Sequence, residues 1–437
     1  MTESPGLRVL VDGPGQSAPG FLRLGDDPGA DASLRAGDDL PFTDRAVDAI
    51  VCGAPIAEAS PSLRVPFLLE CRRVLRPGGR LRLRASEGST GEWRRLFRLV
   101  GFDDVAAAQP ESPAAIDGRA LLDAAKRDRR MRDEPLVSIL IPAFNPRFFA
   151  ASLDSAIGQS WRNLEIVIGD DSPGPEIEAI VHARRGVAIP IRYERNPVRL
   201  QSRGNSIRLF ERAQGDFIKF LNDDDALDPR CVSTLLAAFR SDPDVTLATS
   251  CRTRIDEAGR TLPDQPATMP ILPDTRVVAG HSLANTMIGA GLNVVGEPTT
   301  VLFRKDDLAD QAPRYFRFDD IEGPGIIDMV TWAALLLRGD AVCFRERLSS
   351  FRIHAAQSQR APGYGDRAVD SIRRLQAAWL PLGVYDSLPP DLLLTKSYPP
   401  PDDEEWGLER VHSFVPEPMA PEARMAAWRA ERIASPR

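Results

Sequence analysis

The chain has 437 residues, of which 43% are hydrophobic and 27% charged, and its formal net charge is −7. This composition is typical of a globular protein of two or three domains, and the negative charge argues against a nucleic-acid partner. The five cysteines are widely spaced without a CxxC pair, which indicates neither a zinc site nor a disulfide framework. No leader peptide and no bilayer-length apolar run is visible. We therefore expect a cytoplasmic protein without a transmembrane segment, which would contact a membrane only from its inner face.

The first 107 residues alternate short apolar strands with an amphipathic helix. Buried strands are predicted at Leu7–Val11 and Val47–Gly53. Arg64–Leu75 has helical spacing, with its apolar residues on one face. The RPGG segment that follows stops the helix, and the chain returns as a strand with a period of two. This pattern predicts a βαβ arrangement in domain 1–107.

The composition changes over residues 108–134, which we interpret as a linker or a solvated helix. The segment begins as a loop-like QPESPAA and continues as the charged AAKRDRRMRDEP. A basic cluster of this kind could contact anionic lipid or a partner. Charge runs are more often solvated, so a solvated connector is the preferred interpretation.

A second alternation of strands and helices occupies residues 135–360. The apolar, β-branched run VSILI predicts a strand covered on both faces, and LEIVIG, IPIRYER and FIKFL predict further strands. Helical patterns separate them, so we expect an α/β domain with a mostly parallel, doubly wound sheet. The extension over 361–437 is rich in proline and charge, which predicts a poorly packed segment with one or two helices.

Polar residues follow three of these strands where each strand ends. They are Pro142, Phe144 and Asn145; Asp170 and Asp171; and Asn222, Asp223, Asp224 and Asp225. Ligands of open parallel sheets bind outside the carboxyl ends of the strands, so we expect these groups at one edge. Adjacent carboxylates repel each other, and a hard divalent cation would relieve the repulsion and bridge to substrate phosphates. An ordinary solvated turn is the alternative.

Three segments together resemble a family 2 glycosyltransferase with the GT-A, nucleotide-diphospho-sugar transferase fold. They are VSILIPAFN, LDSAIGQSWRNLEIVIGDDS and NPVRLQSRGNSIRLFERAQGDFIKFLNDDDAL. The resemblance implies an enzyme that moves a sugar from a nucleotide-diphosphate donor to a hydroxyl group, with inversion. It also implies a divalent metal, Mn²⁺ or Mg²⁺, and a glycan or lipid-linked acceptor in surface polysaccharide or glycan synthesis.

The resemblance also assigns residues to the donor nucleotide. Phe144 would lie against the base, with Pro142 and Asn145 beside it in the same segment. Asp171, with Asp170, would hold the base or ribose. The remaining assignments are Arg199 or Arg203 near the diphosphate, Asn205 ordering that loop, and Asp223 in the acidic turn.

The metal would be held by the acidic turn, where the family motif Asp-Ser-Asp-Asp reads Asn-Asp-Asp-Asp in this chain. Asp224 occupies the position that contacts the metal, and Asp223 or Asp225 would assist. His354, in the segment LSSFRIH, would supply a third contact, and a hydrogen-bonded structural histidine is an equal alternative. The other histidines are interpreted as surface residues; they are His182, His281 and His412.

The catalytic base is expected at the start of the helix in Ile326–Asp340, where Asp328 would take the proton of the acceptor hydroxyl. The segment Gly296–Leu308 resembles a strand beside the sugar site. Asp320 and Glu322 are rival candidates for the base, and a helix-capping or surface acid is the structural alternative for Asp328.

The N-terminal region resembles the later half of a class I S-adenosylmethionine-dependent methyltransferase. The resemblance rests on DDLPFTDRAVDAIVCG, FLLECRRVLRPGGRLRL and GFDDV. The glycine loop, with Gly13 and Gly15, departs from the usual pattern, and the stretch up to Leu40 is too short for the usual helix and strands. We therefore expect a truncated, Rossmann-like scaffold that does not bind S-adenosylmethionine. A bifunctional enzyme with a working methyltransferase is the alternative.

Two other functions fit the second domain less well. A nucleotidyltransferase would carry a glycine-rich, basic loop after its first strand, where this chain has PAFNPRFF. A non-catalytic protein that binds sugar nucleotides is the remaining alternative, and the sequence specifies neither the donor sugar nor the acceptor.

Overall fold

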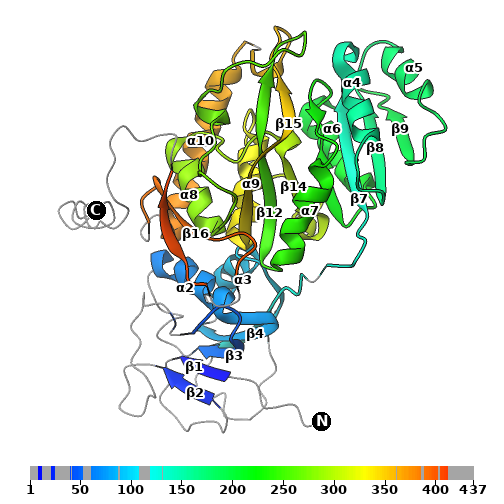
Figure 1. The fold of residues 1–437 in the computed structure, drawn as a ribbon. Helices are drawn as coiled ribbons and strands as arrows, with labels where there is room; N and C mark the ends of the chain where they lie inside the picture. The colour runs from blue at the N-terminus through cyan, green and yellow to red at the C-terminus, as the bar shows by residue number, and fades with distance from the viewer. Residues whose placement is uncertain are drawn as a thin grey trace. The chain divides into compact units, whose positions relative to one another are not determined.

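The computed structural model describes residues 8–11, 21–24, 40, 42–52, 61–86, 89–107, 119–129, 131–360, 362–384, 388–401 and 404–411. The chain forms two compact units, Met1–Arg129 with Ala377–Ser387, and Arg130–Gln376 with Leu388–Arg437 (Figure 1). Three predictions lie outside the described residues. They concern the glycine loop with Gly13 and Gly15, the first part of the linker at 108–118, and the end of the extension at 412–437 with His412.

The small unit is built on a sheet with the strand order β2-β1-β3-β4-β6-β5. The strands β2, β1, β3 and β4 run parallel, whereas β6 is antiparallel to both β4 and β5. The elements are β1 (Arg8–Val11), β2 (Phe21–Leu24), β3 (Val47–Cys52), α2 (Pro61–Val74), β4 (Leu75–Ser86), α3 (Thr90–Leu99), β5 (Phe102–Ala107) and β6 (Arg119–Lys126). The predicted amphipathic helix is confirmed as α2, which buries Val65, Leu68 and Cys71.

Strand β6 shows that the prediction of a connector over 108–134 was wrong for residues 119–126. The composition of this segment favours a helix, but pairing with β4 and β5 satisfies its backbone groups. Asp123 accepts hydrogen bonds from Arg80 Nε (2.9 Å) and Arg82 Nε (3.2 Å), and Lys126 Nζ donates to the carbonyl oxygen of Leu75 (2.8 Å). The charges of Asp123 and Lys126 therefore find their partners across the sheet, whereas most of the charged run follows the strand.

The large unit contains a sheet of 11 described strands in the order β17-β16-β13-β15-β12-β14-β10-β7-β8-β9, with β11 paired to β15. Its strands are β7 (Val137–Ala143), β8 (Leu164–Asp170), β9 (Ile191–Arg195), β10 (Phe217–Phe220), β11 (Ala226–Leu227), β12 (Val245–Ile255), β13 (Arg276–Val278), β14 (Val301–Arg304), β15 (Asp340–Arg352), β16 (Leu392–Lys396) and β17 (Gly407–Arg410). The helices include α4 (Pro146–Ile157), α5 (Glu176–His182), α6 (Gln201–Arg212), α7 (Cys231–Ser241), α8 (Gly280–Ala290), α9 (Ile327–Arg338), α10 (Tyr364–Trp379) and the 3₁₀ turn η3 (Pro298–Thr300).

The α/β class is confirmed, and the sheet is mixed. Strands β9, β8, β7 and β10 are parallel, as are β12 and β15, whereas β14, β13, β16 and β17 pair antiparallel. Parallel pairing is therefore concentrated in the half that carries the predicted nucleotide residues (Figure 1).

Strand β7 is buried on both faces, which explains its continuous apolar sequence. Ile139 and Ile141 belong to one core with Phe149 of α4 and with residues of α5 and α7. On the other face, Phe210 of α6 packs against Phe303 of β14, with ring centroids 6.4 Å apart. Helices thus cover both faces, as predicted for a doubly wound sheet.

The extension over 361–437 packs more closely than its composition predicts. It contributes α10, and β16 pairs antiparallel with β13 and β17. The charged residues of the sequence lie partly within α10 itself, so they do not prevent the helix. Within the described ranges, no helix has the length and apolar character that a bilayer crossing requires.

Two glycines at helix starts give a matched test of the packing of the large unit. A Cβ at Gly280, the first residue of α8, would overlap the carbonyl oxygens of Gly339 and Leu336, whereas one at Gly365 of α10 has no neighbour within 4 Å. We expect Gly280→Ala to lower the free energy of unfolding by ~1–3 kcal/mol through overpacking. Gly365→Ala should raise it by ~0.5–1 kcal/mol through reduced backbone entropy. Urea denaturation of both variants would check this, and equal effects would contradict the α8–α9 packing.

Candidate functional site

The acids at the end of β8 anchor the loops beside it. Asp170 is buried and accepts a hydrogen bond from the Tyr193 hydroxyl (2.7 Å). Asp171 accepts hydrogen bonds from Asn196 Nδ2 (2.7 Å) and from the backbone N–H of Leu200 (3.1 Å). Both predicted nucleotide-binding carboxylates therefore fix the segment between β9 and α6.

The two arginines predicted to lie near the diphosphate, Arg199 and Arg203, have different environments. Arg199 is exposed, and its guanidinium carbon lies 4.1 Å from the ring centroid of Phe144, which is 43% exposed. Arg203 instead donates from Nη1 and Nη2 to the carbonyl oxygens of Phe316 (2.7 Å) and Tyr315 (2.8 Å). Arg199 therefore remains accessible to a ligand, while Arg203 ties α6 to the loop that precedes α9.

Asn205 lies buried on α6 and joins the helix to the sheet. Its Nδ2 donates to the carbonyl oxygen of Gly169 (2.8 Å), and its Oδ1 accepts from Asn196 Nδ2 (3.1 Å). This arrangement agrees with a role in ordering the loop, because Asn196 also contacts Asp171.

Asp223 joins the ends of β10 and β7. Its Oδ2 accepts hydrogen bonds from the backbone N–H groups of Phe144 (2.6 Å) and Asn145 (2.7 Å). Burial raises the pKa of Asp223 to about 6, although both N–H donors favour the ionised form. Asn145 caps α4 through Arg147 N, and Pro142 lies within β7 in register with Gly169.

Asp224 and His354 are brought together as the sequence predicts. His354 Nε2 and Asp224 Oδ2 lie 2.8 Å apart, and the histidine side chain is buried against the ring of Phe148. His354 Nδ1 accepts a hydrogen bond from the backbone N–H of Ala356 (3.2 Å), so the hydrogen-bond pattern assigns the ring proton to Nε2. In this arrangement Nε2–H donates to Asp224.

Asp225 is turned toward protein donors. Its Oδ1 accepts from the backbone N–H of Arg352 (3.0 Å), and its Oδ2 accepts from Thr299 Oγ1 (2.7 Å) and Asn222 Nδ2 (3.1 Å). Burial and the charge of Asp224 hold the pKa of Asp225 well above its usual range. The three predicted ligands are therefore not assembled around one point. Among the described residues, no group of three or more His, Cys, Asp or Glu side chains could hold a metal ion.

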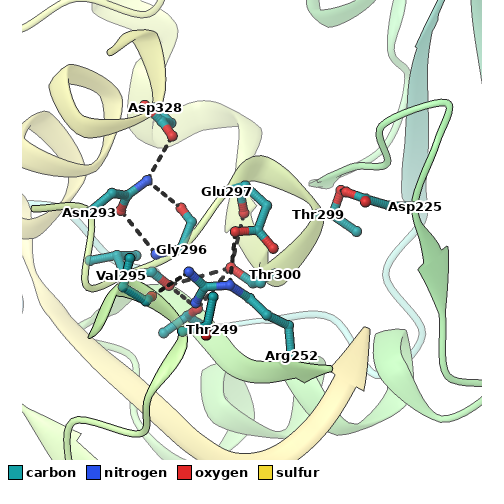
Figure 2. Close-up of polar contacts among 12 residues, drawn as sticks. Asp225, Thr249, Arg252, Asn293, Val295, Gly296, Glu297, Thr299, Thr300 and Asp328 are labelled. Atoms are coloured by element: carbon teal, nitrogen blue, oxygen red, sulfur yellow. Dashed lines mark hydrogen bonds and ion pairs between the residues drawn. The ribbon is translucent and has the colours of Figure 1, made fainter. Parts of the chain in front are cut away.

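Asp328, the predicted base, is the second residue of α9. Its Oδ2 accepts a hydrogen bond from Asn293 Nδ2 at 2.7 Å (Figure 2). Its Oδ1 accepts from Met329 N (2.8 Å). Burial raises the pKa of Asp328 to about 6, against the effect of both donors. The rival candidates Asp320 and Glu322 form ion pairs with the exposed side chain of Arg314, whereas Asp328 is held by Asn293. The rivals therefore do not share the environment of Asp328.

The residues that link Asp328 to the acidic turn were not predicted from the sequence. Figure 2 shows Asn293 at Asp328, the ion pair between Glu297 and Arg252 (2.9 Å), and Thr299 at Asp225. The segment 293–300 thus reaches from the predicted base to the acidic turn. Glu297 and Thr299 lie in the GEPTTVLF segment expected beside the sugar site, whereas Asn293 carries no recognisable motif.

Asp328 should reduce the stability of the folded protein at neutral pH. Because its pKa is about 6 when folded, against an ordinary 3.8, the native state loses stability as the pH rises through this interval. We expect Asp328→Asn to raise the free energy of unfolding by ~1–3 kcal/mol at pH 8, with no gain below pH ~4. Urea denaturation at both pH values would measure this. Asp320→Asn, at an exposed acid, should show no such dependence; a gain that is the same at both pH values would contradict the assignment.

Two parts of the chain match models of known protein families. Residues 138–307 match the family model Glycosyl transferase family 2, and residues 25–83 match a methyltransferase domain model. An uncharacterized protein of Mycobacterium tuberculosis is 30% identical over 274 residues, which cover 59% of this chain and 78% of that protein.

Two enzymes with named activities match shorter stretches. The GalNAc(5)-diNAcBac-PP-undecaprenol beta-1,3-glucosyltransferase of Campylobacter jejuni is 30% identical over 23% of this chain and 34% of its own length. The chondroitin synthase of Escherichia coli is 29% identical over 29% of this chain and 18% of its own length. A crystal structure of S. aureus TarS 1–349 with UDP aligns at a TM-score of 0.41 and 17% identity, over 54% of this chain and 64% of that chain.

The segment that matches the family 2 model lies in the large unit, and it includes the acidic turn. The small unit accordingly carries a methyltransferase-like region. The chain therefore belongs to glycosyl transferase family 2 and is a glycosyltransferase.

Proposed function

We propose that the chain moves a sugar from a nucleotide-diphosphate donor to a hydroxyl group of a glycan or lipid-linked acceptor, with inversion and with a divalent metal. The observation that carries the proposal is the half-buried Asp328, held by Asn293 on the segment that also reaches the acidic turn. The family supports a nucleotide-activated donor. The names of two relatives support this choice of acceptor, since one contains PP-undecaprenol and the other is a chondroitin synthase. In this proposal the products are surface polysaccharides or lipid-linked glycans, and the enzyme is cytoplasmic and acts at the inner face of the membrane.

The donor nucleotide would bind at the ends of β7 and β8. Phe144 offers an exposed ring for the base, and Arg199 lies over that ring. In this proposal the base displaces Arg199 from Phe144, and the released guanidinium pairs with the diphosphate. Asp171 holds the loop, because its carboxylate already binds Asn196 and Leu200.

The donor atoms at the acidic turn fit a metal that is shared with the substrate. Asp224 and His354 offer one carboxylate and one imidazole, whose Oδ2 and Nε2 lie 2.8 Å apart. If a metal replaced the proton on Nε2, phosphate oxygens would complete a set that suits Mn²⁺ better than Mg²⁺, because Mg²⁺ prefers oxygen ligands. Asp225 supports the turn in this proposal instead of coordinating. A bound ion would neutralise the negative charge that develops on the departing nucleoside diphosphate.

Asp328 is the proposed base. Its carboxylate takes the proton of the acceptor hydroxyl, whose oxygen attacks the anomeric carbon of the sugar. The bond from that carbon to the diphosphate breaks as the new glycosidic bond forms, so the configuration inverts. A pKa of about 6 leaves Asp328 mostly ionised at neutral pH while it remains a useful proton acceptor.

The small unit is proposed to be a truncated, methyltransferase-like scaffold without catalysis. Its sheet contains parallel strands followed by an antiparallel pair. Calorimetry with S-adenosylmethionine distinguishes a scaffold from a working methyltransferase, because micromolar binding would support the second. A boundary after Arg129 replaces the one at residue 107 in this proposal.

Donor binding is expected to stabilise the protein in a metal-dependent way. A thermal-shift screen of UDP-, GDP- and dTDP-sugars, with and without Mn²⁺, should show one nucleotide class that raises the melting temperature more when Mn²⁺ is present. Arg199→Ala should weaken that shift. Binding without turnover of the selected donor would favour the non-catalytic alternative.

Transfer should depend on Asp224 and Asp328 in different ways. We expect Asp224→Ala to lose transfer by at least ~10²-fold with its fold intact, because charge on the leaving group is no longer balanced. Asp328→Asn should lose ~10²–10⁴-fold while still binding the donor, because only proton removal is affected. Turnover and donor binding of the two variants separate these roles, with Asp320→Asn as an active control. Full activity of the wild-type protein in metal-free buffer would refute the metal assignment.

A further inference from the structure

Asn293 is fixed by its own hydrogen bonds so that it must donate to Asp328. Its Oδ1 accepts from the backbone N–H of Gly296 (3.0 Å), and its Nδ2 donates to the carbonyl oxygen of the same residue (2.8 Å). The second N–H of Nδ2 therefore points to Asp328 Oδ2 at 2.7 Å (Figure 2). A flipped amide would place two oxygens against each other at both contacts, so its orientation is determined.

Gly296, which holds Asn293, is itself fixed. It has a φ of +113°, and a Cβ at this position would collide with Thr300 Oγ1. Its carbonyl oxygen also accepts a hydrogen bond from Trp332 Nε1 (2.9 Å), which lies on α9, the helix that carries Asp328. Gly296 thus contacts both Asn293 and the helix that carries Asp328, which fixes the position of Asn293 relative to Asp328.

Glu297 acts on Asp328 in the opposite sense. It lies on the same segment, and its Oε2 pairs with Arg252 Nε at 2.9 Å. Its Oε1 is buried, and no residue that the structure describes donates a hydrogen bond to it. Its charge is therefore compensated on one side only. Burial is the main cause of the raised pKa of Asp328, and the charge of Glu297 adds to it.

We propose that Asn293 and Glu297 are an opposed pair of positioning residues on one segment: Asn293 presents a fixed donor to Asp328 Oδ2, and Glu297 places beside it a carboxylate with one oxygen that lacks a described partner. The inference rests on the proposed role of Asp328 as the base. An acceptor base must be ionised before the reaction and must bind a proton during it. The donor serves the first requirement, and burial together with the negative neighbour serves the second.

The other groups that face Asp328 do not take over this role. Tyr364 of α10 lies close enough for the charge of Asp328 to contribute to its raised pKa, but its hydroxyl donates to the carbonyl oxygen of Gly325 (2.7 Å). Arg367, three residues after Tyr364, opposes this rise in the pKa of Tyr364. Within the described part of the chain, the carboxylate of Asp328 accepts side-chain donation from Asn293 alone.

The test is a pH titration of the Asp328 carboxyl carbon by NMR in full-length protein labelled with [¹³Cγ]aspartate. The Asp328 signal is assigned by its loss in Asp328→Asn. We expect Asn293→Ala to raise the proton affinity of Asp328 about tenfold, because a hydrogen bond to the charged form is lost. Glu297→Gln should lower it by a similar factor.

Thr249→Val is the matched control. Thr249 Oγ1 donates to the carbonyl oxygen of Val295 (2.7 Å) and contacts Thr300, so its loss loosens the same segment without touching Asp328. Its titration should match the wild type. The midpoint does not depend on how much protein is folded, so partial unfolding of a variant leaves the test valid.

The outcomes separate this inference from the proposed function. Shifts in opposite directions for Asn293→Ala and Glu297→Gln, with none for Thr249→Val, support the opposed pair. Unchanged midpoints in both variants, or shifts in the same direction, overturn it even if Asp328→Asn is inactive. Full turnover by Asp328→Asn would overturn the base assignment instead, and with it the catalytic meaning of the pair.

Discussion

The carboxylate of Asp225 is the contact on which the arrangement of the site depends. It is buried, and it joins three segments that are distant in sequence: the turn after β10, the 3₁₀ turn η3 and the end of β15. An ionised or partly ionised carboxylate can be buried only if donors surround it, and each segment supplies one. The same contacts set Asp224 beside His354 at one end, and lead through Thr299 to the segment of Glu297 and Asn293.

Buried cations complement this concentration of acids. Lys219 lies fully buried on β10, where its Nζ donates to the carbonyl oxygens of Thr299 and Val301. Burial lowers the pKa of Lys219, while the charges of Glu297 and Asp225 oppose that effect. Arg252 and Arg352 provide further positive charge from β12 and β15. The site therefore carries its own counterions, which allows several carboxylates to lie close together without unfolding the sheet edge.

The sequence predicted those parts of the site whose chemistry lies in short, continuous motifs. The ends of β7, β8 and β10 follow from strand patterns and a recognisable acidic turn. The meeting of Asp224 with His354 agrees with the pair of side chains that the family resemblance implies. The orientations of the side chains were not predictable, because they depend on donors from remote segments. Asp225 resembles a ligand in sequence until Thr299 and Arg352 are brought to it. Strand β6 was missed for a related reason, since its charged residues find their partners only across the sheet.

The pairing of the C-terminal segment with β13 has a consequence for the colloidal behaviour of the protein. Val277 and Val278 of the short strand β13 are covered on one side by β15 and on the other by β16. Without β16, this valine pair would become an open edge with unpaired backbone groups, and such edges recruit strands from other chains. The C-terminal segment looks dispensable from its proline content, but its strand β16 would prevent the sheets of neighbouring molecules from pairing. A protein shortened before β16 would then aggregate even if its catalytic residues were intact.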